Sequence, residues 1–272
     1  MAGWPSPARR KTTTPSRLPE GGRWGMVQGK PSAVMVVGGG VAGIQAALDL
    51  ANRGLHVYLV ERGPSIGGHM AQLDKTFPTM DCSICILAPK MVECGRHPNI
   101  TIITDAEVVG LKGRAGDFRV RVLVRPRYVD LERCTGCGIC VEKCPMRPPL
   151  RRIPDEFNVG LGERRAIYIP FPQAVPRAAI VDPEHCLYLR KNKCLLCEEF
   201  CQAEAVDFSQ QPRELELHVG AIVIATGFEF LDASIVAEYG YGRYKNVLTS
   251  LELERLVCAS GPTGGELVRP SD

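Results

Sequence analysis

The 272-residue sequence lacks the features that mark several large protein classes. No apolar run approaches the roughly 20 residues of a membrane-spanning helix, so we expect the ordered region to be soluble. Nothing in it resembles a hydrolase triad or a P-loop. Residues 1–30 carry six basic side chains against one acidic side chain, so the net charge of +3 becomes −2 for the remainder. This charge balance gives no case for nucleic-acid binding.

The first thirty residues also lack the apolar segment of a secretory signal. They are rich in Pro, Gly, Ser and Thr without periodicity, which predicts a disordered tail. An Arg-rich start poor in acidic residues can imitate an organelle transit peptide. We favour a start codon assigned too early, with Met26 as the true first residue. We then expect a cytoplasmic protein, associated with membranes only through partners.

The chain contains twelve cysteines, a high number for a sequence without an export signal. They are clustered at ligand spacings and are not scattered as in a disulfide framework. Metal or redox chemistry in a reducing compartment is therefore the better interpretation.

Hydrophobic patterning predicts an α/β fold with a β-meander. Buried strands are predicted at Ala33–Val37, His56–Val60, Ile100–Thr104 and Gly220–Gly227, helices at Val41–Asn52 and Ser83–Gly95, and meander strands at Ala106–Leu111, Phe118–Val124 and Glu214–Val219. The meander pattern stops at residue 124 and resumes at residue 214. The cysteine-rich block between these positions is therefore predicted to be an insertion.

We accordingly predict a Rossmann-like, three-layer FAD-binding domain interrupted by an α+β ferredoxin-like insert. The predicted division is a tail at 1–30, the first part of the FAD domain at 31–126, the insert at 127–211, the continuation of the FAD domain at 212–250, and the start of a further region at 251–272.

A glycine-rich turn between the first strand and the first helix predicts a dinucleotide site. Gly38 permits the tight turn, Gly40 lets backbone approach a pyrophosphate, and Gly43 lets the helix pack closely on the strand. The helix N-terminus then offers unpaired N–H groups to the phosphates. Glu61, which ends the second strand, is placed to accept hydrogen bonds from the ribose.

Two further segments favour FAD over NAD. ERGPSIGG, which ends in Gly67-Gly68, is similar to two-dinucleotide-binding flavoproteins, in which an acidic residue precedes a Gly-Gly pair that contacts FAD. IATG, with Thr226 and Gly227, is similar to the second FAD-contacting strand of those families.

Two cysteine runs predict two [4Fe–4S] clusters. Cys134, Cys137, Cys140 and Cys144 follow the C-x2-C-x2-C-x3-C-Pro spacing of bacterial ferredoxins. Cys186, Cys194, Cys197 and Cys201 form a second run, in which the first gap is wider and Gln202 replaces the usual proline. The fourth cysteine of each run usually ligates the other cluster. One cluster then takes Cys134, Cys137, Cys140 and Cys201, and the other takes Cys186, Cys194, Cys197 and Cys144.

A third cysteine group contains Cys82, Cys85 and Cys94 and follows the Gly-Gly pair. In pyridine nucleotide–disulfide oxidoreductases a redox disulfide lies at a similar place, against the flavin. The alternatives are a dithiol that exchanges electrons with FAD, a third cluster that takes a ligand from elsewhere, and buried cysteines that act as small apolar side chains.

Taken together, these features resemble the A subunit of heterodisulfide reductase from about residue 32 onward. The most specific stretches are GGHMAQLDKTFPTMDCSICILAPKMVECGRHPNI at Gly67–Ile100, CTGCGICVEKCP at Cys134–Pro145 and IYIPFPQAVP at Ile167–Pro176. A paralogous subunit from a membrane-bound, quinone-interacting oxidoreductase is similar and remains an alternative.

The resemblance implies an oxidoreductase subunit of anaerobes that moves electrons between FAD and clusters, in some complexes by electron bifurcation. It implies B-like and C-like partner subunits, a hydrogenase or formate dehydrogenase module that supplies electrons, and ferredoxin. Family members are longer, so we expect either a fragment, inactive alone, or a neighbouring gene that supplies the C-terminal half. The competing hypotheses are a truncated iron–sulfur relay with an empty flavin site and a zinc-binding scaffold.

Overall fold

The computed structural model describes residues 26–27 and 30–271. Most of the predicted tail at 1–30 lies outside the described residues. The described part of it forms two short antiparallel strands, β1 (Met26–Val27) and β2 (Lys30–Pro31).

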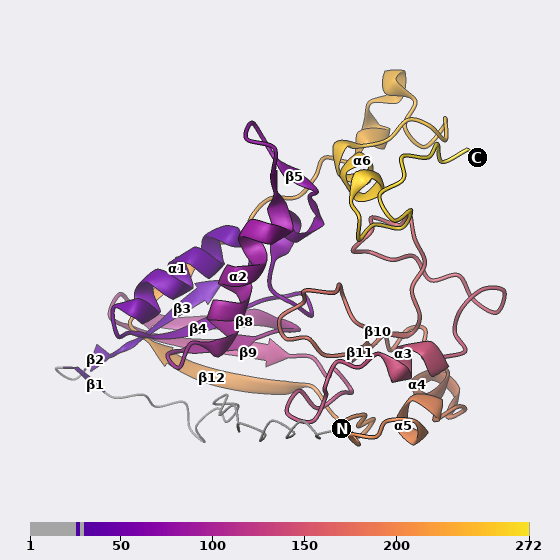
Figure 1. Ribbon diagram of the computed structural model, residues 1–272. Helices are drawn as coiled ribbons and strands as arrows, with labels where there is room; N and C mark the ends of the chain where they lie inside the picture. Colours follow the sequence, from indigo (N-terminus) through magenta and orange to yellow (C-terminus); the bar gives the residue numbers. More distant parts are fainter. Residues whose placement is uncertain (1–25, 28–29, 272) are drawn as a thin grey trace, which may run out of the picture.

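A parallel sheet lies at the centre of the first domain. It contains β3 (Ala33–Val37), β4 (His56–Val60), β7 (Ile100–Ile103) and β13 (Ala221–Ile224), in the order β13-β3-β4-β7. All pairs in this sheet are parallel, which confirms the predicted βαβ start. Two helices, α1 (Val41–Asn52) and α2 (Ser83–Arg96), lie together on one face of the sheet (Figure 1).

An antiparallel meander covers the opposite face of the parallel sheet (Figure 1). Its strands are β8 (Ala106–Arg114), β9 (Asp117–Val124) and β12 (Arg213–Val219), in the order β12-β9-β8. Val124, the last residue of β9, pairs with Arg213, the first residue of β12. The meander therefore resumes after the intervening segment, as the alternating pattern predicts, and the structure shows that the two halves meet end to end.

Successive side chains along β3 and β4 point alternately to the helices and to the meander, and this produces the three layers. Val36 and Leu59 belong to the core shared with the helices, whereas Met35 and Tyr58 belong to the core shared with the meander. Successive strand residues point to opposite faces, so fully apolar strands are what a sheet covered on both sides requires. The three-layer prediction is confirmed.

The cysteine-rich insert has a separate hydrophobic core. Its elements are short: α3 (Ile139–Lys143), β10 (Ile167–Tyr168), β11 (Ile180–Val181), α4 (Leu187–Lys191) and α5 (Leu196–Glu199). Its two ends are joined, because Val129 bridges Val206 and the Asp130 N–H donates to the Ala205 carbonyl at 2.7 Å. The insert thus leaves and re-enters the first domain at nearly the same place.

The segment Arg62–Met80 is more ordered than the predicted loop. It contains a 3-10 helix, η1 (Gly68–Gln72), and β5 (Lys75–Thr76), which forms a small hairpin with β6 (Asp81–Cys82) directly after the segment. Asp74 lies between η1 and the hairpin, and its N–H donates to the Glu254 carboxylate at 2.8 Å. Hydrophobic periodicity does not predict these elements, because each contains five residues or fewer and is too short to show a period.

The C-terminal segment adds η2 (Ala233–Ile235), η3 (Ala237–Tyr239) and α6 (Ser250–Val257). Arg255 on α6 is fully buried and donates to Gln72 of η1 and to Asn158 of the insert. Within the described residues, no helix is long and apolar enough to cross a bilayer.

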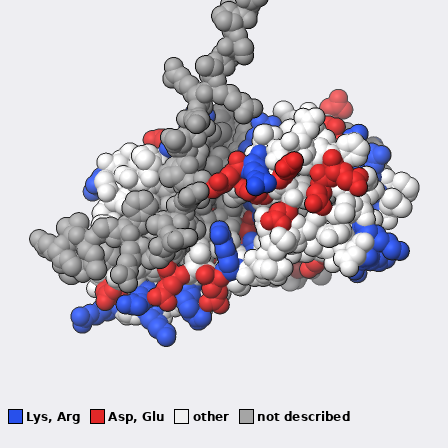
Figure 2. All heavy atoms as spheres, turned by 90° about the horizontal axis from the view of Figure 1, so that it is seen from below, with Lys and Arg blue, Asp and Glu red and all other residues white. Residues whose placement is uncertain are grey.

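One edge of the parallel sheet is β13, which among the described strands pairs only with β3. Ile224 at its end is 70% exposed, and Phe228 and Leu231 just beyond it are 62% and 70% exposed. On the meander, by contrast, Arg119 and Arg121 form exposed ion pairs with glutamates of β12. Figure 2 shows acidic and basic side chains interspersed over the face seen from below.

Candidate functional site

The glycine-rich turn after β3 is built by close backbone approaches. Gly38 has φ +105°, and a Cβ there would lie 2.2 Å from the Ala225 carbonyl oxygen beyond β13. A Cβ on Gly43 would lie 1.9 Å from the Gly38 carbonyl oxygen. Both glycines are thus required for packing, which lets α1 begin directly above the sheet edge.

Gly40, in contrast, borders open space. A Cβ built on Gly40 would meet no atom within 4 Å. Gly40 is the N-cap of α1, and no side chain caps that helix end. The first-turn N–H groups and a Cβ-sized opening are what the binding of a diphosphate requires. The residues present therefore fit the predicted dinucleotide.

The other predicted FAD-contacting residues gather around this turn. The Gly67 N–H donates to the Gly39 carbonyl at 2.7 Å, and a Cβ on Gly68 would lie 2.9 Å from the Gly40 Cα. Thr226 directly follows Ala225, and its Cα would lie 3.1 Å from a Cβ on Gly38. Gly227 is next in the chain, so all these residues lie at the carboxyl edge of the parallel sheet.

Glu61 joins the turn to the loop that follows β4. One carboxylate oxygen accepts the Gly39 N–H at 2.6 Å, and the other accepts the Gly63 N–H at 2.6 Å. A carboxylate has about four acceptor positions, so both oxygens can still accept ribose hydroxyls. The sequence pattern does not predict this second role, in which Glu61 holds the turn and the loop together.

The first predicted cluster set is brought together across a long sequence separation. Burial and the neighbouring thiols of Cys134, Cys137 and Cys201 raise the pKa of Cys140 to about 12. The Ala205 N–H donates to the Cys201 sulfur at 3.3 Å. Four sulfurs this close repel one another once they are ionised, and the irons of a cluster would supply the positive charge that stabilises four thiolates.

The second predicted set lines one small cavity. The cavity is bordered by Cys144, Cys186, Cys194 and Cys197 together with apolar side chains that include Ile167 and Val181. Burial and the neighbouring thiols raise the pKa of Cys197 to about 12. Cys140 of the first set is among these neighbours, so the two sets adjoin.

The described residues contain no group of three or more His, Cys, Asp or Glu side chains that could hold a single metal ion. A cubane spreads its four cysteines over four different irons, so the wider sulfur spacing is compatible with a cluster.

The third cysteine group is divided by the structure. Cys82 and Cys85 form a disulfide at the start of α2. Cys94 is nine residues further along the same helix, about 14 Å along the helix axis. It is completely buried against α1, and burial raises its pKa to about 12. The structure therefore does not bring Cys94 to the other two thiols, and its environment matches the small-apolar alternative.

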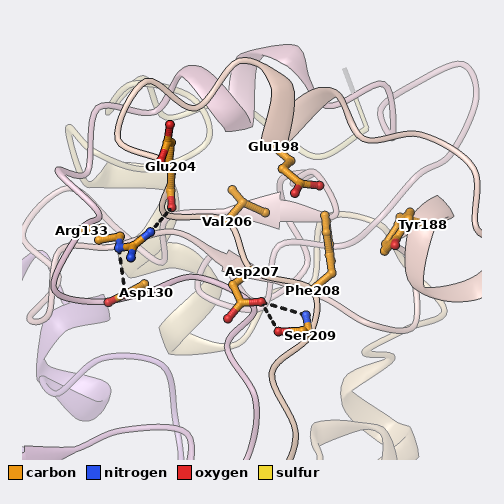
Figure 3. Close-up of a pocket in the computed structure, with 9 residues that line it drawn as sticks. All are labelled: Asp130, Arg133, Tyr188, Glu198, Glu204, Val206, Asp207, Phe208 and Ser209. Atoms are coloured by element: carbon orange, nitrogen blue, oxygen red, sulfur yellow. Dashed lines mark hydrogen bonds and ion pairs between the residues drawn. The ribbon is translucent and has the colours of Figure 1, made fainter.

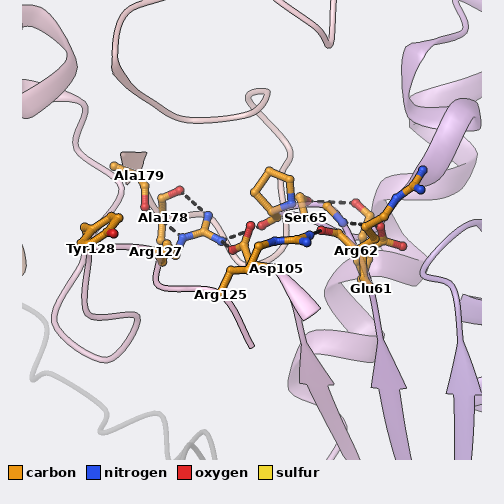
Figure 4. A network of polar contacts seen from close by, with 12 residues as sticks. Glu61, Arg62, Ser65, Asp105, Arg125, Arg127, Tyr128, Ala178 and Ala179 are labelled. Atoms are coloured by element: carbon orange, nitrogen blue, oxygen red, sulfur yellow. Dashed lines mark hydrogen bonds and ion pairs between the residues drawn. The ribbon is translucent and has the colours of Figure 1, made fainter. Parts of the chain in front are cut away.

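A buried arginine joins the insert to the loop that follows β4, residues 62–67, which is called the flavin-site loop because the predicted FAD contacts flank it (Figure 4). Arg127 is 5% exposed and forms an ion pair with Asp105 at 2.9 Å. It also donates to the carbonyls of Pro64, Ala178 and Ala179 at 2.8–2.9 Å. Burial raises the pKa of Asp105, and the Arg127 charge opposes that rise. Sequence reasoning missed both residues, although Arg127 is the first residue of the predicted insert.

The stretch that Arg127 holds makes further contacts with the flavin-site loop. The Val175 N–H donates to the Ser65 hydroxyl at 2.9 Å, and the Ile66 N–H donates to the Val175 carbonyl at 3.0 Å. A Cβ on Gly136 would lie 2.6 Å from the Arg177 carbonyl oxygen, so the first cysteine run packs against the same stretch. Residues 174–179 thus connect a cluster loop to the loop after Glu61.

The insert also has an acidic hollow of about 490 Å³ (Figure 3). Asp130, Glu198, Glu204 and Asp207 line it, with the Phe208 ring among them. Arg133 lies over its rim, 3.5 Å from Asp130, and donates to the Glu204 carbonyl. No sequence pattern indicates this hollow, because its acids come from three separate segments.

Comparisons with known proteins match two segments of the chain to cofactor-binding families. Residues 33–81 match the family described as FAD dependent oxidoreductase, and residues 127–148 match the 4Fe-4S binding domain. These matches confirm the predicted fold class and the assignment of FAD and iron–sulfur clusters as cofactors. A crystal structure of L-proline dehydrogenase from P. horikoshii is 29% identical with a TM-score of 0.30, covering 34% of this chain and 19% of that chain.

Longer curated relatives share most of this chain. The A subunit of H(2):CoB-CoM heterodisulfide,ferredoxin reductase from Methanothermobacter marburgensis is 54% identical over 238 residues, 88% of this chain and 35% of the relative. The second of two iron-sulfur A subunits of CoB--CoM heterodisulfide reductase from Methanopyrus kandleri is 59% identical over the same shares. The chain thus spans about a third of the length of these relatives.

Proposed function

The chain is a homologue of heterodisulfide reductase A subunits over 88% of its length, and on this basis we propose that it passes electrons between FAD and two [4Fe–4S] clusters. FAD is assigned to the turn Gly38–Gly43, Glu61, the pair Gly67-Gly68, and Thr226-Gly227. The clusters are assigned to the two crossed cysteine sets.

The contact between the insert and the flavin-site loop carries this proposal. Arg127 and the stretch 174–179 hold the cysteine-rich module directly against the loop that follows Glu61. A buried, hydrogen-bonded junction fixes the distance between two sites better than a flexible linker does. A fixed short distance is what single-electron transfer between them requires.

The chemistry then divides between bound groups and protein. A bound flavin exchanges electrons in pairs or singly, whereas each cluster carries one at a time. The protein positions the diphosphate at the start of α1 and the ribose at Glu61. It also supplies hydrogen bonds to cluster ligands, such as the Ala205 N–H on Cys201, and such bonds tune a cluster's potential.

The proposal also covers the partner subunits of the chain and the reaction of the whole complex. We propose that the chain works in the cytoplasm with heterodisulfide reductase B-like and C-like subunits, a hydrogenase or formate dehydrogenase module, and ferredoxin. The names of the relatives support ferredoxin and H2- or formate-linked assemblies. Bifurcation at the flavin is part of this extended proposal. A chain corresponding to the rest of the relatives' length, if separately encoded, would be a further partner.

Anaerobic purification with metal and flavin analysis tests the proposal. We expect bound FAD, about eight irons per chain and a matching amount of acid-labile sulfide. Iron and sulfide without flavin, also after addition of excess FAD, would instead support an iron–sulfur relay. Zinc without sulfide would contradict the cluster assignment and support a scaffold.

A methyl group at Gly40 separates folding from FAD binding. Gly40→Ala has room in the structure and an extended backbone at φ −74°, so we expect a change in the free energy of unfolding of less than about 1 kcal/mol. The methyl group would occupy the space of the diphosphate, and FAD affinity should fall at least about tenfold. Flavin fluorescence titration measures it. Gly43→Ala, whose Cβ would clash with Gly38, should lower both stability and affinity. Unchanged affinity in Gly40→Ala would contradict the site.

A further inference from the structure

The start of α2 carries a disulfide whose surroundings differ from those of the cluster cysteines. Cys82 and Cys85 are bonded, with Cα atoms 5.2 Å apart, and Cys85 is exposed. The bridge spans three positions, and a loop this short gains less stability from cross-linking than a long one. Exposed disulfides are typically the labile or catalytic kind. A purely structural role is therefore the weaker interpretation.

The two sulfurs are not equivalent. Cys82 is the N-cap of α2, only partly exposed, and its sulfur accepts the Cys85 N–H at 3.3 Å. A helix N-terminus and a backbone N–H both stabilise a thiolate. Cys82 is thus the better leaving group when the bond breaks, and the exposed Cys85 is the sulfur that an incoming thiolate can reach.

A shallow hollow extends from Cys85 along the outer side of α2. It is lined by Cys85, Ala88, Pro89, Val92, Glu93 and Arg96, and it ends at His97 and Pro98. Val92 within it and Ile86 beside it are 39% and 41% exposed. The hollow is mainly apolar near the disulfide and carries charge at its far end. Such a surface suits a short apolar segment that follows a cysteine.

We propose that Cys82–Cys85 is a thiol–disulfide exchange centre for a partner protein that carries a dithiol and docks along the outer side of α2. A partner thiolate attacks the Cys85 sulfur, the Cys82–Cys85 bond breaks, and Cys82 leaves as a thiolate. The second partner thiol attacks the mixed disulfide and releases Cys85. The partner dithiol is oxidised to a disulfide, and its two protons end on Cys82 and Cys85. The exchange is reversible and involves neither flavin nor cluster.

Thiol counting and trapping on the anaerobically purified full chain test the chemistry. Treatment with dithiothreitol should expose two thiols more than in untreated protein, as counted by alkylation and mass spectrometry. Cys82→Ser should form a mixed disulfide with oxidised glutathione at Cys85. Cys85→Ser should react at Cys82 at least about tenfold more slowly, because Cys82 is less exposed. No new thiols after dithiothreitol, or loss of iron in either variant, would overturn the proposal.

A second comparison tests docking. Val92→Asp should slow reduction by thioredoxin, used as a protein dithiol probe, at least about tenfold but leave reduction by dithiothreitol unchanged. Leu111→Asp on β8, 55% exposed, is the matched control and should change neither rate. Equal thioredoxin rates in both variants would rule out the hollow as the docking site. Because the reductant is added externally, the result is independent of whether FAD binds.

Discussion

Replacing Arg127 with methionine should lower the free energy of unfolding by about 3–5 kcal/mol. The substitution keeps most of the volume but leaves the buried Asp105 carboxylate without its counter-charge, and breaking a buried pair has a cost of this size. The carbonyls of Pro64, Ala178 and Ala179 also lose their donor. Chemical denaturation of the anaerobic protein measures the loss.

The loss of stability in Arg127→Met should also depend on pH. Burial already raises the Asp105 pKa, and removing Arg127 should raise it further. A folded-state pKa above the unfolded value means that the folded chain holds the proton more tightly, so stability falls as pH rises above the ordinary aspartate range. The Arg127→Met defect should be smaller at pH 5 than at pH 8.

An exposed arginine provides the control for this prediction. Arg121 pairs with Glu214 on the meander, and both side chains are about half exposed. Arg121→Met should have an effect of less than about 1 kcal/mol. Limited proteolysis adds a local measurement, because only the Arg127 variant should release the stretch 174–179 from the flavin-site loop. Equal stability losses in the two variants would show that the junction does not depend on Arg127.

Cys144→Ser should remove the cluster whose other three ligands are Cys186, Cys194 and Cys197. Because Cys144 lines the cavity with Cys186, Cys194 and Cys197, its loss should cost about four of eight irons and leave the cluster of Cys134 in place. Cys201→Ser should give the opposite result. Iron analysis measures the loss, and electron paramagnetic resonance of the reduced protein shows whether one cluster or an interacting pair remains.

Further variants identify which cluster is lost. Combining Cys144→Ser with Cys194→Ser should remove no more iron than either alone, because both residues would serve one cluster. Cys258→Ser is the control, since that thiol is buried near Ser260 and belongs to neither set. If Cys144→Ser and Cys137→Ser proved to affect the same cluster, ligation would not be crossed.

The main layers and the cofactor motifs could be predicted from sequence because both have strong short-range signals. Strands such as Ala33–Val37 are apolar throughout, and the cysteine spacings are specific. The return of the meander after residue 214 followed from two matching halves of one alternating pattern, whereas the pairing of Val124 with Arg213 is known only from the structure. In each case the local residue pattern agrees with the overall fold, and under that condition the structure of a segment can be predicted from its sequence alone.

The parts that sequence missed depend on tertiary contact. Asp105 and Arg127 are single charged residues whose pairing becomes meaningful only when the insert folds back onto the loop after β4. The contact of Arg255 with Gln72 and Asn158 spans even longer separations. The fate of Cys82, Cys85 and Cys94 was also left open, because spacing alone does not show which thiols of a helix share a side.

The border strand β13, which has β3 as its one neighbour among the described strands, has a practical consequence for handling the protein. Its outward N–H and C=O groups, next to the exposed Ile224, Phe228 and Leu231, can template any extended peptide that meets them. Concentrated samples should therefore self-associate through the exposed edge of β13, unless another polypeptide or a charged substitution covers that edge. Crystallisation and storage would benefit from a lysine at Ile224.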